Sequence, residues 1–66
     1  MTHYTLLDIV SQIKESADEV KKEERNDLNF GKLLAYAEAL SIIRDVYSGD
    51  LAKIGLDFDV DKRYLL

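Results

Sequence analysis

Apolar and polar positions divide the chain into two helical segments and a tail with a different period. From Leu6 onward, apolar residues recur at alternating spacings of four and three, a pattern typical of an amphipathic helix with one buried stripe. The stripe consists of Leu6, Val10, Ile13, Ala17 and Val20. Thr5 and Asp8 have the spacing of a capping box, in which each side chain bonds the backbone amide of the other residue. We therefore expect a first helix over about residues 5–24.

The second helical segment is apolar on nearly all sides instead of along one stripe. Its apolar residues are Leu33, Leu34, Tyr36, Ala37, Leu40, Ile42, Ile43, Val46 and Tyr47. Such all-round apolarity is typical of a helix that is buried on every side. Asn26, Asp27 and Asn29 offer turn and capping residues before it. Gly49 can adopt the left-handed conformation that ends a helix, so we expect this helix over about residues 29–48.

The tail, residues 50–66, changes period. Residues 51–54 fit one helical turn that Gly55 can close, and from there to Asp61 apolar residues alternate with aspartates. A period of two indicates extended chain. The inward positions would be Leu56, Phe58 and Val60. We expect an extended C-terminal arm lying on the helices, with Asp61 capping a last turn; the alternative is a strand shared between two chains.

Length and composition favour self-association. A chain of 66 residues forms one small domain, residues 1–66, and folding buries only about 60% of the surface that the unfolded chain exposes. The sequence has no cysteine and one histidine, His3, which excludes disulfides and ordinary zinc sites. Oligomerisation is the remaining means of stabilisation. We therefore predict an all-α fold, an antiparallel helical hairpin with an extended C-terminal arm, that pairs into a homodimeric four-helix bundle.

Small residues in the second helix indicate where two copies would meet. Gly31, Ala35 and Ala39 recur at intervals of four and would form one row along the helix. A glycine inside a helix costs about 1 kcal/mol relative to alanine, and close approach of another helix would offset that cost. The row can equally face the first helix of the same chain. The predicted dimer interface consists of Gly31, Leu34, Ala35, Ala39, Ile42 and Val46.

Charge and hydropathy narrow the range of partners. Thirteen acidic and nine basic residues give a net charge of −4, which opposes binding to the phosphate backbone of nucleic acid. No apolar run reaches the roughly 20 residues that span a bilayer, and the first residues lack the basic start of a secretion signal. We expect no nucleic-acid or membrane partner and a cytoplasmic location. No nucleophile with a neighbouring base and no phosphate-binding glycine loop is recognisable, so we expect no enzyme activity and no cofactor.

Three aspartates provide the only local motif with metal chemistry. Asp57, Asp59 and Asp61 match the first three ligands of an EF-hand loop. The sixth position of that loop, normally glycine, is Lys62, so the three are weak candidates and we predict no metal site. The function we expect is a small non-enzymatic protein-interaction or regulatory module with an unidentified protein partner. The alternatives are a module that responds weakly to divalent cations and an acidic inhibitor that mimics nucleic acid.

Overall fold

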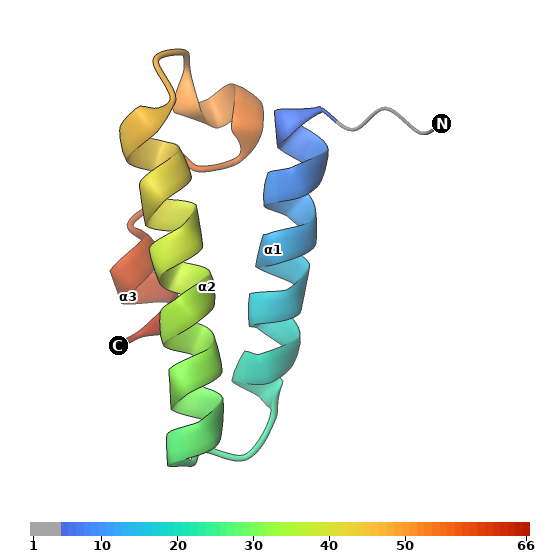
Figure 1. Cartoon of the computed structure of the whole chain (residues 1–66), viewed down its shortest axis with the longest axis vertical. Helices are drawn as coiled ribbons and strands as arrows, with labels where there is room; N and C mark the ends of the chain where they lie inside the picture. The colour runs from blue at the N-terminus through green and yellow to red at the C-terminus, as the bar shows by residue number, and fades with distance from the viewer. Residues whose placement is uncertain (1–4) are drawn as a thin grey trace.

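The computed structural model describes residues 5–66, which contain helices and turns but no strand. The helices are α1 (Leu6–Lys22), α2 (Asp27–Val46) and α3 (Val60–Tyr64), and η1 (Leu51–Ile54) is a short 3₁₀ helix. Figure 1 shows α1 and α2 antiparallel and side by side, with α3 next to α2. The η1 segment packs against α1. The predicted all-α class and the antiparallel hairpin are confirmed.

The start of α1 follows the predicted capping box. The Asp8 amide donates to the Thr5 hydroxyl at 3.2 Å, and the Thr5 amide donates to the Asp8 carboxylate at 3.0 Å. The Asp8 carboxylate also accepts from the Thr5 hydroxyl at 2.9 Å. The bond from the Thr5 amide, followed by the bond from the Thr5 hydroxyl, lowers the pKa of the Asp8 carboxyl below its ordinary value of 3.8. Within the predicted stripe, Val10, Ala17 and Val20 are buried. The helix ends at Lys22, close to the expected end.

The start of α2 differs from the prediction because the chain uses the earliest of the three capping candidates. The Asn29 amide donates to the Asn26 side-chain oxygen at 2.8 Å, so Asn26 is the N-cap and the helix begins at Asp27. Asn29 is buried inside the first turn, where its side-chain nitrogen donates to the Glu24 carbonyl at 2.7 Å. The second bond holds the connection between the helices against α2.

The end of α2 also differs. The helix stops at Val46, and Tyr47 turns the chain away with φ −70° and ψ 125°. The expectation that Gly49 closes the helix in a left-handed conformation is wrong, because among the described glycines only Gly55 has a positive φ, at 75°. Gly49 instead allows close approach. A Cβ there would lie 2.5 Å from the Tyr47 hydroxyl oxygen.

The tail keeps the predicted alternation of inside and outside but is less extended than expected. Leu56 and Val60 are buried and Phe58 is half-buried, whereas the three aspartates between and after them are exposed. The last helix begins earlier than predicted, because Asp59 rather than Asp61 is its cap and accepts from the Lys62 amide at 3.2 Å. This start places Val60 and Tyr64 four residues apart on one buried face. Residues 56–59 are neither helix nor strand within this chain, and the strand shared between two chains stays an untested alternative.

Cationic side chains from both long helices hold the backbone of the tail. Lys14 in α1 donates to the Gly55 carbonyl at 3.0 Å, and Arg44 in α2 donates to the Leu56 carbonyl at 3.3 Å. Lys21 bonds a third carbonyl, at the end of α3. Gly55 and Leu56 lie outside regular secondary structure, which leaves their carbonyls without helix or sheet partners, and a buried acceptor without a donor is costly. These three bonds therefore fix where the tail lies.

An aromatic side chain reinforces this attachment. The Phe58 ring lies 5.1 Å from the Lys14 ammonium and 4.9 Å from the Arg63 guanidinium, both within the range of cation–π attraction. The ring also meets Tyr64 edge to face at 6.4 Å. Arg63 in turn lies 3.6 Å from the Asp18 carboxylate in α1. The tail therefore joins α1 and α2 through packing and charge together.

The core draws on all three parts of the chain. Its buried members are Val10, Ala17, Ala37, Leu40, Ile54, Leu56, Val60 and Tyr64. Half of this set lies in the tail, which therefore completes the core.

Replacing Leu56, which is fully buried, with alanine should test that role of the tail. The substitution removes packed methyl groups and leaves a cavity, so we expect the free energy of unfolding to fall by about 2–5 kcal/mol. Urea denaturation followed by far-ultraviolet circular dichroism measures the change. Asp57→Ala, at the exposed neighbouring position, is the matched control and should shift the value by less than about 0.5 kcal/mol. Equal effects of the two substitutions would contradict the assigned packing.

Candidate functional site

The most prominent surface feature is a set of exposed apolar side chains on α2. The exposed fractions are 70% for Leu28, 53% for Phe30, 40% for Leu34, 63% for Ile42 and 77% for Val46. Full burial of a large aliphatic or aromatic side chain is worth about 1.5–3 kcal/mol. The helix is therefore not buried on all sides within one chain. Neither α1 nor the tail covers these side chains fully.

Five of the six residues predicted to form the dimer interface lie on one face of α2. Successive helical residues are rotated by about 100°, so residues 28, 31, 35, 39, 42 and 46 fall within a sector of about 80°. We call this set the α2 stripe: Leu28, Gly31, Ala35, Ala39, Ile42 and Val46. All of its members are exposed except Ala39, which is half-buried.

The part of the stripe formed by its small residues Gly31 and Ala35 faces away from α1. A Cβ added at Gly31 would meet no atom within 4 Å, and Ala35 is exposed. The alternative that the row of small residues packs on α1 is therefore wrong for these two positions. Nothing among the described residues offsets the helical cost of Gly31.

Two residues distinguish the α2 stripe from the predicted dimer interface. Leu34 was predicted but lies outside the stripe, whereas Leu28 lies in the stripe but was not predicted. Leu34 lies to one side of the stripe and lines, together with Ile42 of the stripe, a groove that α2 shares with Asp61 and Leu65 of the tail. Leu28 belongs to the stripe, although the sequence argument began the helix after it. The signal that identifies Leu28 is the spacing of Asn26 and Asn29, which is that of an N-cap and the third helical residue.

Charges border the stripe asymmetrically. By the same helical rotation, Glu38 and Asp45 lie along one edge and Lys32 along the other. All three side chains are exposed. The stripe is thus an apolar band with an acidic edge and a basic residue opposite it.

No known protein family, curated protein or solved structure matches the chain. Its function has to be inferred from its own surface. Among the described residues, no helix has the length and apolarity needed to cross a membrane.

The aspartates of the tail do not form a metal centre in the structure. Within residues 5–66, no group of three or more His, Cys, Asp or Glu side chains is placed to hold a metal ion. Asp59 is used as the cap of α3, while Asp57 and Asp61 are exposed. His3 lies outside the described residues.

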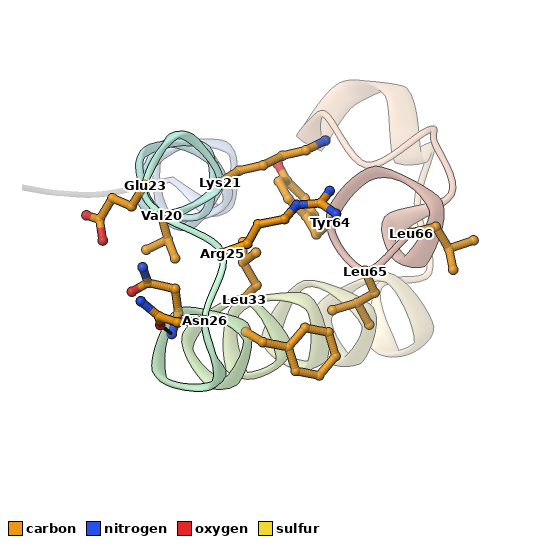
Figure 2. A pocket seen from close by; sticks show the side chains of 11 residues that line it. Val20, Lys21, Glu23, Arg25, Asn26, Leu33, Tyr64, Leu65 and Leu66 are labelled. Atoms are coloured by element: carbon orange, nitrogen blue, oxygen red, sulfur yellow. Dashed lines mark hydrogen bonds between the residues drawn. The ribbon is translucent and has the colours of Figure 1, made fainter.

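A small cavity lies where the connection between α1 and α2 meets the end of the tail. Its volume is about 180 Å³, and Figure 2 shows the side chains that line it. Arg25 reaches toward Tyr64, whereas Glu23 points away from the cavity. Lys21, also in the lining, already bonds a carbonyl of α3. These side chains do not form the adjacent acid–base pair or nucleophile that catalysis requires.

Tyr64 is the one residue of this cavity with an unusual electrostatic environment. It is 3% exposed, and its hydroxyl has no hydrogen-bond partner among the described residues. Burial raises the pKa of this hydroxyl above its ordinary value of 10.0, and the nearby Asp18 carboxylate raises it further. Because both effects favour the neutral phenol, Tyr64 is a packing residue at neutral pH.

The raised pKa of Tyr64 predicts a loss of stability in alkali. Above about pH 10 the unfolded chain releases the Tyr64 proton more readily than the folded chain, so the free energy of unfolding falls as pH rises through that region. Tyr64→Phe should remove this contribution. At pH 7 the variant should be as stable as the wild type or more stable by up to about 1 kcal/mol, since an unpartnered hydroxyl is lost.

Urea unfolding at pH 7 and at about pH 10.5, just above the ordinary tyrosine pKa, measures the difference. Tyr36→Phe, at a half-buried position in α2, serves as the control and should retain the Tyr64 contribution. An alkaline loss that is unchanged in Tyr64→Phe would contradict this interpretation.

Proposed function

We propose that the protein is a small non-enzymatic protein-interaction module that acts as a helical homodimer through the α2 stripe. The observation that carries the proposal is the exposure of Leu28, Ile42 and Val46, at 70%, 63% and 77%, on one face of a helix. Monomeric proteins rarely leave a continuous apolar surface of this kind without a partner.

A second copy of the chain is a partner that would stabilise it. Small domains have little core of their own and commonly gain stability by association. Burying the three large side chains of the stripe on both copies would recover several kcal/mol, a substantial share of the 5–15 kcal/mol typical of a whole domain. Two hairpins joined through α2 would form a four-helix bundle. A two-fold interface of this kind is self-complementary, so one sequence serves both sides.

Pairing through α2 leaves the other surfaces free for a further partner. The outer face of α1 presents Glu15 and Glu19, and the tail presents Asp57. The net charge of −4 per chain doubles in a pair. Complementary charge steers association and selects partners, which favours a protein with a basic surface. In this proposal the regulatory contact lies on the acidic faces while α2 sets the spacing between two copies of them.

The small area of the α2 stripe predicts a homodimer of low affinity. A standard interface buries about 800 Å² on each partner, roughly a sixth of the 4899 Å² that this chain exposes. The stripe runs along a helix about 30 Å long, and a single helix face of that length supplies only part of such an area. We therefore expect dissociation at micromolar concentrations, and the experiment has to span that range.

Light scattering across a dilution series, with wild type and Ala35→Glu in parallel, tests the proposal. Ala35 is exposed in the single chain, so the monomer accommodates the glutamate, whereas a dimer would bury its charge. We expect the wild type to approach twice the chain mass of 7.6 kDa at high concentration. The variant should remain at the chain mass throughout.

Ser11→Glu provides the matched control. It introduces the same charge at an exposed position of α1, away from α2, and should leave dimerisation unchanged. Circular dichroism confirms that both variants fold. A wild type that stays at 7.6 kDa at every concentration would rule out the homodimer.

A further inference from the structure

The order of large and small residues in the α2 stripe carries information about how two copies pair. From one end to the other the stripe presents one large, three small and two large side chains. The middle of the stripe lies at the level of residue 37. Reversing the helix about that level brings residue 28 opposite residue 46, residue 31 opposite the region of residue 42, and residue 35 opposite residue 39. The reversed stripe therefore sets Ile42 against the space that Gly31 of the other copy leaves open, and it lets the two helices approach closely at Ala35 and Ala39.

We propose that the two copies pair antiparallel through α2, with Ile42 of each chain packing over Gly31 of the other. The proposal rests on the homodimer proposed above and specifies its geometry. Gly31 provides the space, because a Cβ at this position would meet no atom within 4 Å. Ile42 provides the side chain, since 63% of it is exposed. The contact occurs twice in a two-fold pair.

A parallel pair would use the same residues less well. Each residue would then face its own copy, so Gly31 would lie opposite Gly31 and Ile42 opposite Ile42. The first contact leaves a void and the second is crowded, and both kinds of misfit destabilise packed interfaces. The antiparallel arrangement replaces both with a large residue opposite a small one. It also sets the positive end of each α2 dipole beside the negative end of the other.

The edges of the stripe predict how the pair responds to salt. In an antiparallel two-fold pair each edge meets the same edge of the other copy, so Glu38 and Asp45 face further carboxylates. Salt screens repulsion between exposed charges, and dimerisation should become stronger as ionic strength rises. In a parallel pair the acidic edge would meet the edge that carries Lys32, which offsets part of the repulsion between two chains of net charge −4 each. The strengthening of dimerisation by salt should therefore be larger for the antiparallel pair than for the parallel one.

Single-cysteine variants test the geometry, because the native sequence has no cysteine. In an antiparallel pair, the two copies of residue 28 lie about 27 Å apart, since 18 positions separate residues 28 and 46 at 1.5 Å each. A disulfide requires Cα atoms within about 7 Å. Leu28→Cys alone and Val46→Cys alone should therefore not crosslink. An equal mixture of the two should crosslink under mild oxidation to twice the 7.6 kDa chain mass.

The crosslinking experiment uses Ser11→Cys as its control, because Ser11 is exposed on α1 and should give no crosslinked product. Self-crosslinking of Leu28→Cys and of Val46→Cys would overturn the antiparallel arrangement in favour of the parallel one. A wild type that is dimeric by light scattering while no stripe variant or mixture crosslinks would also overturn it. A monomeric wild type would reject the homodimer itself, which the mass measurement distinguishes from an incorrect geometry.

A pair of substitutions provides an independent test that does not need oxidation. Gly31→Leu fills the open space and should abolish dimerisation at concentrations where the wild type is paired. Adding Ile42→Ala in the same chain makes room for the new leucine only if residues 31 and 42 meet across the interface. The double variant should therefore regain the dimer mass, and failure to regain it while the chain remains helical would count against the contact.

Discussion

The main constraint on the structure is that α2 has more apolar surface than α1 and the tail can bury. This helix is apolar on more sides than a chain of 66 residues can shield. One long helix and one short tail are available, and each protects one side: α1 packs along α2, and α3 packs beside it. The side that remains carries Ile42 and Val46. The association that we propose follows from this geometry, because burial of apolar area is the largest favourable contribution to both folding and association.

The attachment of the tail explains how an acidic chain organises its few basic residues. Three of the nine basic residues, Lys14, Lys21 and Arg44, point at backbone carbonyls of the tail. Hydrogen bonds from charged donors are stronger than those between neutral groups. Lys21 and Arg44 remain exposed and Lys14 is half-buried, so these side chains bind the tail while their charge stays at the surface.

Sequence alone predicted the parts of the fold in which one local rule operates without competition. The bonds between Thr5 and Asp8, the stripe of α1 and the alternation from Leu56 to Val60 each follow from spacing. Prediction failed where several residues satisfy the same rule. Asn26 and Asn29 are both good caps, and so are Asp59 and Asp61. Which of the two residues caps each helix depends on which neighbouring side chains become buried, and the spacing of residues along the chain does not predict that burial.

The sequence predicted some features of α2 and not others for the same reason. Its surplus of apolar residues was visible in the sequence, because composition around a helix does not depend on the exact boundaries. The membership of the exposed face was predicted less completely. Leu28 was missed because the helix was started too late, and Leu34 was included although the tail gives it a neighbour. The spacing of residues in the sequence predicts which of them share one face of a helix. Which face of α2 the tail covers depends on tertiary packing, which the spacing does not predict.

The contacts that fasten the tail join residues far apart in the sequence: the bond from Lys14 to the Gly55 carbonyl spans 41 positions. Contacts of such long range form only after a large loop has closed, which costs chain entropy. The connection between α1 and α2 covers only residues 23–26, so pairing of these two helices closes a much shorter loop. Loop closure therefore costs more chain entropy for the tail than for the hairpin. Burial of Leu56 and Tyr64 in the core has to offset that cost, so the position of the tail depends on packing and not on chain connectivity.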